Sequence, residues 1–485
     1  MTHFAAIDLG ASNGRVILGD VTPRSISMTE VHRFGNGPAR VPDAEGSTYY
    51  TPVVALFQEV CAGIRKAASI AGGLAAIGID SWGVDYGLLG PGGRLSHPMV
   101  HYRDRRTDPM PAKLFSHVDP SRYYGWTGSQ VQPFNTIFQL MAALEREEIA
   151  PSDRLLLLPD LLGYWLTGEQ VAEATNASTT GMLDPAERNW HPEVLSLIRQ
   201  QTPLDPARLL PGVVEPGNIL GELRGEAADL LVASQTTRVV NVASHDTGSA
   251  VTAIPAVSDD FAFISCGTWS IVGVELDTPV LTESARKLNF GNELGADGTV
   301  RFIANVMGLW PLQEMMREWA TTGTEIPVAE LVQEAASVTP LRFRFNAFDA
   351  RLLPPGNMTE RVAMLSREMT GAAPASPPEF ARCVLDSLAV AYRVAIEQAQ
   401  ALSGKQVGVV HMVGGGVQNE LLVQLTSDAT GLPIVAGPVE GAALGNLLIQ
   451  ARAAGVLEGT LADLRRLPVN GQTPRRYVPR ASLQQ

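Results

Sequence analysis

Cysteine is scarce in this chain of 485 residues, and the three that occur, Cys61, Cys266 and Cys383, lie far apart. None belongs to a CxxC pair, so the reduced thiols of an intracellular protein fit better than a disulfide or zinc framework. Long apolar runs are also missing, since stretches such as Leu155 to Leu158 are far too short to span a bilayer. Charged Asp8 interrupts the first apolar run, which argues against a secretory signal. The sequence therefore predicts a cytoplasmic protein.

Positive charge is in deficit as well. Lys and Arg number 37 against 50 Asp and Glu, a net charge of −13. Nucleic-acid binding normally needs a basic face, so the expected partners are small molecules. A phosphorylated ligand would have to be neutralised locally by loops, Arg15 and a metal ion. Apolar residues make up 45%, as in an ordinary globular protein, and the length favours two large domains.

The hydrophobic pattern predicts alternating strands and helices. The run FAAID-GASN-GRVILGD reads as two strands joined by a polar turn, and Thr51 to Ala71 carries helix-spaced apolar residues. Two further strand-like runs follow in LAAIGIDSWGVDYGLL. This alternation indicates an α/β protein.

The same succession returns about 250 residues later. FAFISCGTWSIVGVEL reads as strand, turn and strand, Ser376 to Ser403 as a long helix, and VGVVHMVGGG as a strand that ends in glycines. We therefore expect two domains of related architecture. The predicted division is residues 1–245, residues 246–455 and a C-terminal tail of residues 456–485.

Three short glycine-rich segments and the turn CGTWS carry the chemistry. DLGASNGR, at Asp8 to Arg15, can direct successive N–H groups toward an anion, although a plain hairpin turn is the alternative; it matches neither GxxxxGK[ST] nor GxGxxG. In CGTWS, Thr268 can donate its hydroxyl to a phosphate oxygen. In GGGVQN, a helix that begins near Asn419 could present N–H groups to a nucleotide.

The remaining glycine-rich segment, SHDTGSA, places Asp246 among small residues. Two phosphate-type loops in separate halves of the chain, with this lone aspartate between them, suggest ATP held in a cleft between two domains. Asp246 could cap a helix, which is the commonest structural role of an aspartate before small residues. It could equally be the base that accepts a hydroxyl proton during phosphoryl transfer. The spacing alone leaves the two roles open.

These segments occur in order with others that together resemble the FGGY family of carbohydrate kinases. The resemblance spans Phe4 to about Arg452, with one departure from many members, PFNTIFQL in place of a Lys-x-Trp run. It implies two actin-like, ribonuclease-H-like ATPase domains around a central cleft. The matching segments are DLGASNGRV, IGIDSWGVDYGLL, HYRDRRTD, ATNASTTGMLDPAERNW, SHDTGSA, CGTWSIVG, NVMGLWPLQEMMREW and GGGVQN.

The resemblance also implies roles for single residues. Asp246 matches the catalytic base, and Asp8 resembles the residue that orients Mg²⁺ and its waters. The implied ATP contacts are Ala11, Ser12, Asn13, Gly14, Arg15, Thr268, Gln313, Gly415 and Asn419. The implied sugar contacts are Gly83, His245, Asp246, Thr247 and Asn305.

The implied activity is transfer of phosphate from ATP, with Mg²⁺, to the C1 hydroxyl of L-rhamnulose. The alternative is a related kinase that acts on L-fuculose, xylulose or another polyol. A non-catalytic actin-like switch or sensor is disfavoured, because such a protein should lack Asp246. The sequence leaves open whether the protein is a monomer or a homodimer.

Overall fold

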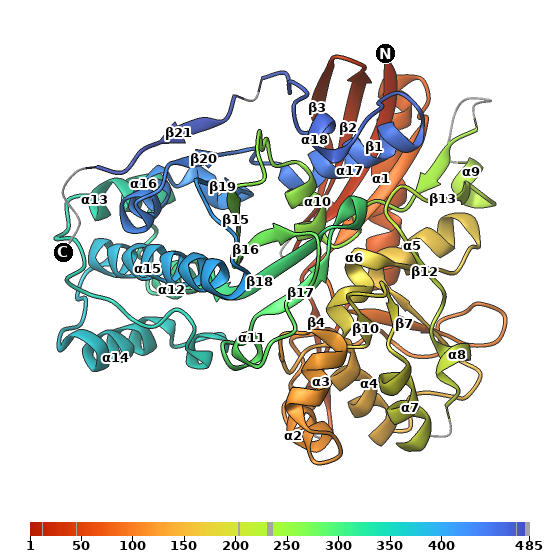
Figure 1. Ribbon diagram of the computed structural model, residues 1–485, viewed down its shortest axis with the longest axis horizontal. Helices are drawn as coiled ribbons and strands as arrows, with labels where there is room; N and C mark the ends of the chain where they lie inside the picture. Colours follow the sequence, from red (N-terminus) through yellow and green to blue (C-terminus); the bar gives the residue numbers. More distant parts are fainter. Residues whose placement is uncertain (12, 45, 202–203, 230–235, 472, 481–485) are drawn as a thin grey trace. The chain divides into compact units, whose positions relative to one another are not determined.

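The computed structural model describes residues 1–485 except 12, 45, 202–203, 230–235, 472 and 481–485. The chain forms two compact units, each built from separate stretches of sequence (Figure 1). The first unit comprises Met1–Val257, Leu276–Phe302 and Gly441–Gly471, and the second comprises Ser258–Glu275, Ile303–Glu440 and Gln472–Gln485. Residues 246–257 and 441–471 belong to the first unit. The expected division of the domains at residue 245 remains a prediction.

A six-stranded sheet forms the centre of the first unit, in the order β13-β14-β6-β1-β2-β3. β1 and β2 form the predicted antiparallel hairpin, and β1, β6 and β14 run parallel. The strands are β1 (Thr2–Leu9), β2 (Asn13–Thr22), β3 (Ser25–Gly35), β6 (Ala76–Ser81), β13 (Ile219–Glu222) and β14 (Arg238–Val240).

Helices cover both faces of this sheet. α1 (Val53–Ala71) confirms the predicted helix, and its apolar side packs with α5 (Leu158–Thr167) against one face, where Ile7 of β1 points. α17 (Gly441–Ala453) packs against the other face, where Phe4 points. Because successive side chains of a strand alternate, β1 contributes to both cores. Figure 1 shows α17, in blue, beside the red strands β1 and β2, at the opposite end of the sequence.

Smaller elements complete the first unit. Of the two strands expected in residues 74–89, β6 joins the central sheet, whereas β7 (Tyr86–Leu89) pairs with β8 (Arg154–Leu157). The chain turns away between them at Val84, which has φ of 68°. The other elements are β4 (Ala39–Asp43), β5 (Gly46–Tyr50), α2 (Met110–Phe115), α3 (Pro120–Thr127), α4 (Thr136–Glu145), β9 (Ala172–Glu173), α6 (Ala174–Ala177), β10 (Leu183–Asp184), β11 (Asn189–Trp190), α7 (Pro192–Gln201), α8 (Pro206–Leu209), β12 (Val213–Val214), α9 (Glu226–Asp229), α10 (Asp246–Thr252), α11 (Glu283–Lys287), β17 (Gly291–Leu294) and α18 (Leu461–Leu464).

The second unit is built on the sheet β18-β16-β15-β19-β20-β21. The hairpin of β15 and β16, the long helix α15 and the strand β19 are where the sequence predicts them. Its elements are β15 (Phe261–Cys266), β16 (Trp269–Leu276), β18 (Val300–Met307), α12 (Trp310–Thr321), α13 (Val328–Ala335), α14 (Met358–Thr370), α15 (Pro377–Ser403), β19 (Val409–Val413), α16 (Glu420–Thr430), β20 (Ile434–Ala436) and β21 (Arg475–Tyr477).

The two sheets share one strand pattern, as the repeated succession predicts. Across each sheet, an antiparallel hairpin (β1-β2; β15-β16) lies beside two parallel strands (β6, β14; β19, β20) and then an antiparallel edge strand (β13; β21).

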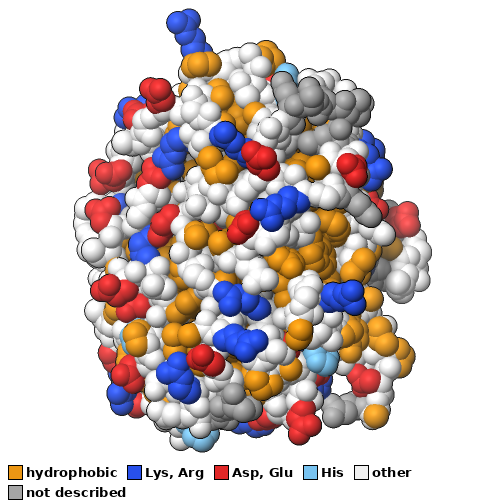
Figure 2. All heavy atoms as spheres, turned by 90° about the vertical axis from the view of Figure 1, so that its right-hand side faces the viewer, with side chains coloured by type: hydrophobic (Ala, Val, Ile, Leu, Met, Phe, Trp, Pro, Cys, Tyr) orange, Lys and Arg blue, Asp and Glu red, His pale blue; other side chains and the backbone are white. Residues whose placement is uncertain are grey.

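Acidic, basic and apolar side chains are interspersed on the face drawn in Figure 2. Among the residues described, no helix has the length and apolar character needed to cross a membrane.

Candidate functional site

Two aspartates lie side by side near the carboxyl ends of two central strands, β1 and β6, of the first unit's sheet. Asp8 near the end of β1 lies in register with Asp80 of β6 and, across the hairpin, with Arg15 of β2. The Arg15 guanidinium donates to Asp8 Oδ2 from Nε at 3.0 Å and from an Nη atom at 2.8 Å. Asp8 is buried, whereas the Arg15 side chain is 23% exposed. The pair therefore presents a cation at the surface above a buried carboxylate.

Asp80 is completely buried and is held from α17. Its Oδ2 accepts a hydrogen bond of 2.6 Å from Asn446 Nδ2, and Gln450 Nε2 donates at 2.6 Å to Asn446 Oδ1. Burial raises the pKa of Asp80 well above the ordinary aspartate range, and the Asp8 carboxylate adds to the rise. The hydrogen bond from Asn446 opposes it. The charged form of Asp80 is thus disfavoured unless a cation lies nearby.

The segment before α10 is fixed by a dense set of hydrogen bonds. Ser244 donates to Glu173 Oε2 from its backbone N–H at 2.9 Å and from its hydroxyl at 2.6 Å. The N–H of His245 donates to Thr175 Oγ1, and the carbonyl of Ser244 accepts from the N–H of Ser81 at 2.9 Å. Glu173 is buried and also caps α6. These bonds hold the backbone of Ser244 and His245 on several sides, and they therefore fix the backbone position at which the next residue begins.

That residue, Asp246, is the first of α10, and the cap position belongs to His245, which makes no side-chain capping bond. The alternative of Asp246 as a helix cap is therefore wrong. Its Oδ1 accepts from the N–H of Thr247 at 2.6 Å. Burial raises the pKa of Asp246, His245 opposes that rise, and the Asp8 carboxylate adds to it. A raised pKa makes a carboxylate more basic, as a proton acceptor requires.

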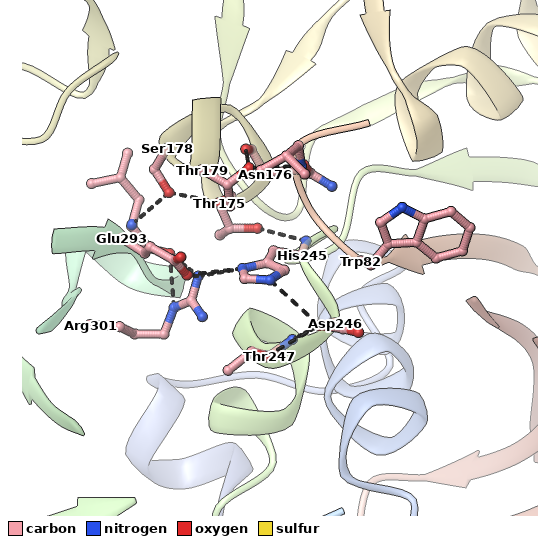
Figure 3. Close-up of polar contacts among 12 residues, drawn as sticks. Trp82, Thr175, Asn176, Ser178, Thr179, His245, Asp246, Thr247, Glu293 and Arg301 are labelled. Carbon is pink, nitrogen blue, oxygen red and sulfur yellow. Dashed lines mark hydrogen bonds and ion pairs between the residues drawn. The ribbon is translucent and has the colours of Figure 1, made fainter. Parts of the chain in front are cut away.

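The imidazole of His245 lies between two acidic groups, as Figure 3 shows. Its Nε2 is 3.5 Å from Asp246 Oδ1, and its Nδ1 is 3.0 Å from Glu293 Oε2. Arg301, which is fully buried, places an Nη atom 3.1 Å from the same Glu293 oxygen and donates to the carbonyl of Leu294. The ion pair of Glu293 and Arg301 thus contacts the ring at Nδ1. The other ring nitrogen, Nε2, is directed toward Asp246.

The loop before Arg15 is a tight turn, in which the N–H of Gly10 donates to the carbonyl of Asn13 at 3.1 Å. Neither Gly10 nor Gly14 has a φ in the left-handed region. Gly14 is needed for space, because a Cβ there would lie 2.4 Å from the Phe34 ring. Ser12 lies outside the described residues. The predicted loop residues that are described are Ala11, Asn13, Gly14 and Arg15.

Gly83 lies in the turn that follows β6. A Cβ at this position would come within 2.8 Å of Thr179 Oγ1, and the same hydroxyl accepts from the N–H of Val84. Thr247, one residue into α10, is buried. The first unit therefore brings the predicted residues Asp8, Arg15, Gly83, His245, Asp246 and Thr247 to the ends of β1, β2 and β6 and the start of α10.

In the second unit, Thr268 lies in the turn between β15 and β16. Its hydroxyl donates to Gln313 Oε1 at 3.3 Å, so these two predicted nucleotide contacts are neighbours. The turn packs on the start of α12, where the N–H of Leu309 donates to the carbonyl of Gly267. A Cβ at Gly308 would lie 2.5 Å from the Thr268 carbonyl oxygen, so glycine is needed for this approach.

The triple glycine after β19 packs on the same turn. A Cβ at Gly414 would lie 2.9 Å from the Cys266 carbonyl oxygen, and one at Gly416 would lie 2.2 Å from Cys266 Sγ. A Cβ at Gly415 would meet no protein atom within 4 Å. Of the three glycines, Gly415 is thus the one that leaves open space above the backbone. Burial raises the pKa of the Cys266 thiol, which disfavours its reactive thiolate form.

Two other predicted contacts have different surroundings. Asn419 caps α16 by accepting from the N–H of Leu422 at 3.0 Å, which gives it a structural role. Asn305 lies on β18 in the second unit and is partly buried. Their contacts with nucleotide and sugar remain predictions.

The sequence reading missed Glu173, Glu293 and Arg301. Each contacts the segment around His245 from a distant part of the chain; Glu173 and Ser244 are 71 residues apart. Their one signal is a single charged residue within an otherwise apolar or small-residue run, as in VAEATNAS and FGNELG.

Two family models match successive parts of the chain. Residues 4–253 match the N-terminal domain of the FGGY family of carbohydrate kinases, and residues 262–454 match its C-terminal domain. Proteins named rhamnulokinase from Bacteroides thetaiotaomicron and Enterococcus faecalis are 38% and 39% identical to this chain. The first alignment covers 96% of this chain and 93% of the relative, and the second 94% and 90%.

Solved structures share the fold at low identity. A ligand-bound xylulose kinase from Lactobacillus acidophilus superposes with a TM-score of 0.79 at 17% identity, covering 99% of this chain and 94% of its own. A glycerol kinase from Plasmodium falciparum, solved with ADP, has a TM-score of 0.77 at 13% identity with the same coverage. With its duplicated strand pattern, its two glycine-bearing turns and matches to both domains, this chain belongs to the FGGY family of carbohydrate kinases.

Proposed function

We propose that this protein transfers the γ-phosphoryl group of ATP to the C1 hydroxyl of L-rhamnulose, giving L-rhamnulose 1-phosphate and ADP in L-rhamnose catabolism. The observation that carries the proposal is the likeness to proteins named rhamnulokinase, which extends over more than nine-tenths of the chain. The cytoplasm is the compartment that this role requires, as the sequence also suggests.

Asp246 is the proposed base. It accepts the proton from O1 of the ketose as that oxygen attacks the γ-phosphorus in line with the leaving ADP. Burial, which raises its pKa, makes this transfer more favourable, and the bonds to the Ser244–His245 backbone keep the carboxylate in place. Gly83, His245, Thr247 and Asn305 are the proposed contacts of the sugar.

The phosphates are the proposed ligands of the two turns. In the first unit, the backbone around Asn13 and the cation of Arg15 bind them, with Ala11, Ser12 and Gly14 as further proposed contacts. In the second unit, Thr268 and Gln313 donate or accept hydrogen bonds, and Gly415 and Asn419 border the nucleotide. Groups fixed in advance around the transferring phosphoryl group stabilise its charge without reorganisation.

The acidic residues fit a divalent cation held largely by phosphates and water. No three His, Cys, Asp or Glu side chains in the described part of the chain form a protein cage for a metal. Mg²⁺ commonly keeps several waters beside substrate phosphates and one or two carboxylates. Asp8 would orient those waters, and Asp80, whose buried Oδ1 has no hydrogen-bond partner among the described residues, lies in register with it. When bound, Mg²⁺ would neutralise charge on the phosphates.

The test is sugar-stimulated ADP release with ATP and Mg²⁺, measured for L-rhamnulose, L-fuculose, L- and D-xylulose and glycerol. A clear preference for L-rhamnulose supports the proposal. Preference for another ketose keeps the kinase and withdraws the substrate. Absence of stimulation by every sugar withdraws the activity.

Replacement of the base tests the chemistry. Asp246→Asn keeps the shape but removes the proton acceptor, so we expect kcat to fall at least about a hundredfold with little change in ATP affinity. Asp277→Asn, which changes an exposed aspartate between β16 and α11, is the matched control and should keep wild-type kcat. A near-normal kcat for Asp246→Asn would remove Asp246 from the mechanism.

A further inference from the structure

The turn between β6 and β7 is strained at a residue that takes no part in the proposed chemistry. The N–H of Asp85 donates to the carbonyl of Gly83 at 2.9 Å, and Val84 between them has φ of 68°. The turn is thus a γ-turn with positive φ at its central residue, a form that is rare and strained. Positive φ is a pronounced outlier for a β-branched residue, and strain of this kind concentrates at functional sites.

Side chains from two other segments hold this turn in place. The N–H of Val84 donates to Thr179 Oγ1 at 3.1 Å. The Val84 carbonyl accepts from two side chains of α4, Thr136 Oγ1 at 2.7 Å and Gln139 Nε2 at 3.2 Å. All three side chains are buried. A strained conformation persists only where its surroundings over-determine it, and these hydrogen bonds do so for Val84.

One backbone group of the turn is left without a partner. The carbonyl of Gly83 accepts from Asp85, and the carbonyl of Asp85 accepts from the N–H of Leu158 at 2.9 Å. The N–H of Gly83, by contrast, has no hydrogen-bond partner among the described residues, although Gly83 is buried. Buried N–H groups without a partner are rare, because leaving one unpaired is costly. The Gly83 N–H is therefore a donor whose acceptor has to come from a bound molecule.

Thr179 contacts both residues that set the direction of this N–H. Its hydroxyl oxygen is the acceptor for Val84, and a Cβ at Gly83 would lie 2.8 Å from the same oxygen. The hydroxyl in turn donates to the carbonyl of Asn176 at 2.8 Å, which fixes its orientation. The peptide group between Gly83 and Val84 is thus held at both ends, its carbonyl by Asp85 and its N–H by Thr179.

The segment that carries Thr179 also holds the residue before the proposed base. Thr175 Oγ1, four residues earlier, accepts from the N–H of His245 at 3.1 Å, as Figure 3 shows. Residues 175–179 therefore contact the strained turn at one end and the start of α10 at the other. A ketose bound to the Gly83 N–H is in this way positioned with respect to Asp246.

We propose that Thr179 is a positioning residue for the sugar, which holds the peptide group between Gly83 and Val84 so that the N–H of Gly83 donates to an oxygen of the ketose. Gly83 is the group that binds, and Thr179 acts through it. This role rests on the proposed sugar-kinase activity and extends it to a residue that does not itself touch the substrate.

Two variants at position 179 separate the hydroxyl from the shape of the side chain. Thr179→Val keeps the shape and loses both hydrogen bonds, whereas Thr179→Ser keeps the hydroxyl. We expect Thr179→Val to raise the KM for L-rhamnulose roughly tenfold, with the KM for ATP unchanged. The calorimetric Kd for L-rhamnulose without ATP should rise equally, and Thr179→Ser should restore both values. Equal losses for ATP and ketose, or a serine variant as poor as the valine variant, overturn the inference.

Thr167→Val is the matched control. Thr167 is fully buried at the end of α5, donates to the carbonyl of Gly163 at 2.8 Å and accepts from the N–H of Glu169 at 3.2 Å. The variant therefore loses the same two kinds of hydrogen bond as Thr179→Val, and it should leave the ketose KM unchanged. A similar rise in the ketose KM would assign both effects to general destabilisation and contradict the positioning role.

Hydrogen exchange at the Gly83 amide of the wild-type protein tests the inference without any variant. L-rhamnulose, added without ATP, should slow this exchange at least about tenfold, whereas ATP alone should not. Unchanged exchange at Gly83 in a protein that binds the ketose overturns the inference, even if no variant folds. A wild-type protein that neither binds nor phosphorylates any ketose refutes the proposed function, and the role of Thr179 with it.

Discussion

At the scale of single residues, the glycines after β19 differ in what their missing side chains permit. Gly414 and Gly416 allow the backbone to approach Cys266, because a Cβ at either would come within 3.0 Å of it. Gly415 has no such contact with the protein. A substitution at Gly415 can therefore report on a ligand without disturbing the fold.

Gly415→Ala is expected to leave the unfolding free energy nearly unchanged and to raise the KM for ATP roughly tenfold, or about 1.4 kcal/mol. The reason is that the new methyl group occupies space toward the proposed nucleotide. Thermal unfolding and initial-rate kinetics measure the two quantities. Gly212→Ala, at another glycine with open space around its Cβ, is the control. If ATP binding is unaffected, Gly415 does not border the nucleotide.

Residues with local signals were predictable, whereas residues with distant partners were not. Asp246 is predictable because small residues surround it in one segment, and Thr268 because it occupies a polar turn between two apolar runs. Glu293 binds His245 only after β17 and α10 have been brought together by the fold. Sequence spacing carries no information on such a contact, so the contact between Glu293 and His245 is found only in the structure.

At the scale of elements, the contact between α10 and α17 is unusually close. A Cβ at Gly445 of α17 would lie 1.8 Å from the carbonyl oxygen of Ser249 in α10, so only glycine allows the two backbones to approach. α10 begins with Asp246, while α17 supplies Asn446, the hydrogen-bond partner of Asp80. This one crossing therefore sets the positions of two carboxylates.

Gly445→Ala should lower the unfolding free energy by about 1–3 kcal/mol, because the methyl group forces the helices apart. Since α10 moves with this displacement, kcat should fall as well. Urea unfolding and ADP-release rates measure the two effects. Gly125→Ala on the exposed side of α3 meets no atom within 4 Å and should be neutral or slightly stabilising. Unchanged stability and kcat for Gly445→Ala would contradict the close contact.

The elements themselves follow from pattern. Apolar alternation gives the hairpins of β1-β2 and β15-β16, and helical spacing gives α1 and α15. The separation of β7 from the central sheet was not foreseen, since its apolar run resembles that of β6. Which sheet a buried strand joins depends on the turn before it and on tertiary packing, so local hydrophobicity does not determine it.

At the scale of the whole molecule, buried carboxyl groups make stability depend on pH. Burial raises the pKa of Asp85 to about 7, against the hydrogen bonds from Trp82 and Gln139. The folded state therefore favours the protonated form, and its contribution to stability is complete below the unfolded-state pKa of about 4. It is lost as the pH rises through about 7, at a cost of up to roughly 4 kcal/mol for the wild-type chain.

Asp85→Asn removes this titration. Relative to the wild-type protein, the unfolding free energy of the variant should increase as the pH is raised from 4 to 7. Urea unfolding of both proteins at several pH values in this window measures the difference. Asp277→Asn, at an exposed aspartate, should run parallel to the wild type at every pH. A constant difference between Asp85→Asn and wild type would show that Asp85 has the same pKa folded and unfolded.

Because the first unit is built from separate stretches of sequence, it cannot complete its core until the last stretch has been synthesised. Strands β1, β6 and β14 appear early, but one face of their sheet is covered by α17, near the end of the chain. Until that helix has been translated, the core cluster of Phe4, Ile17 and Val242 lacks the leucines that α17 contributes. Through most of its synthesis the nascent chain therefore has an incomplete core in the first unit. A polypeptide truncated before residue 441 should bind chaperones and be degraded by proteases.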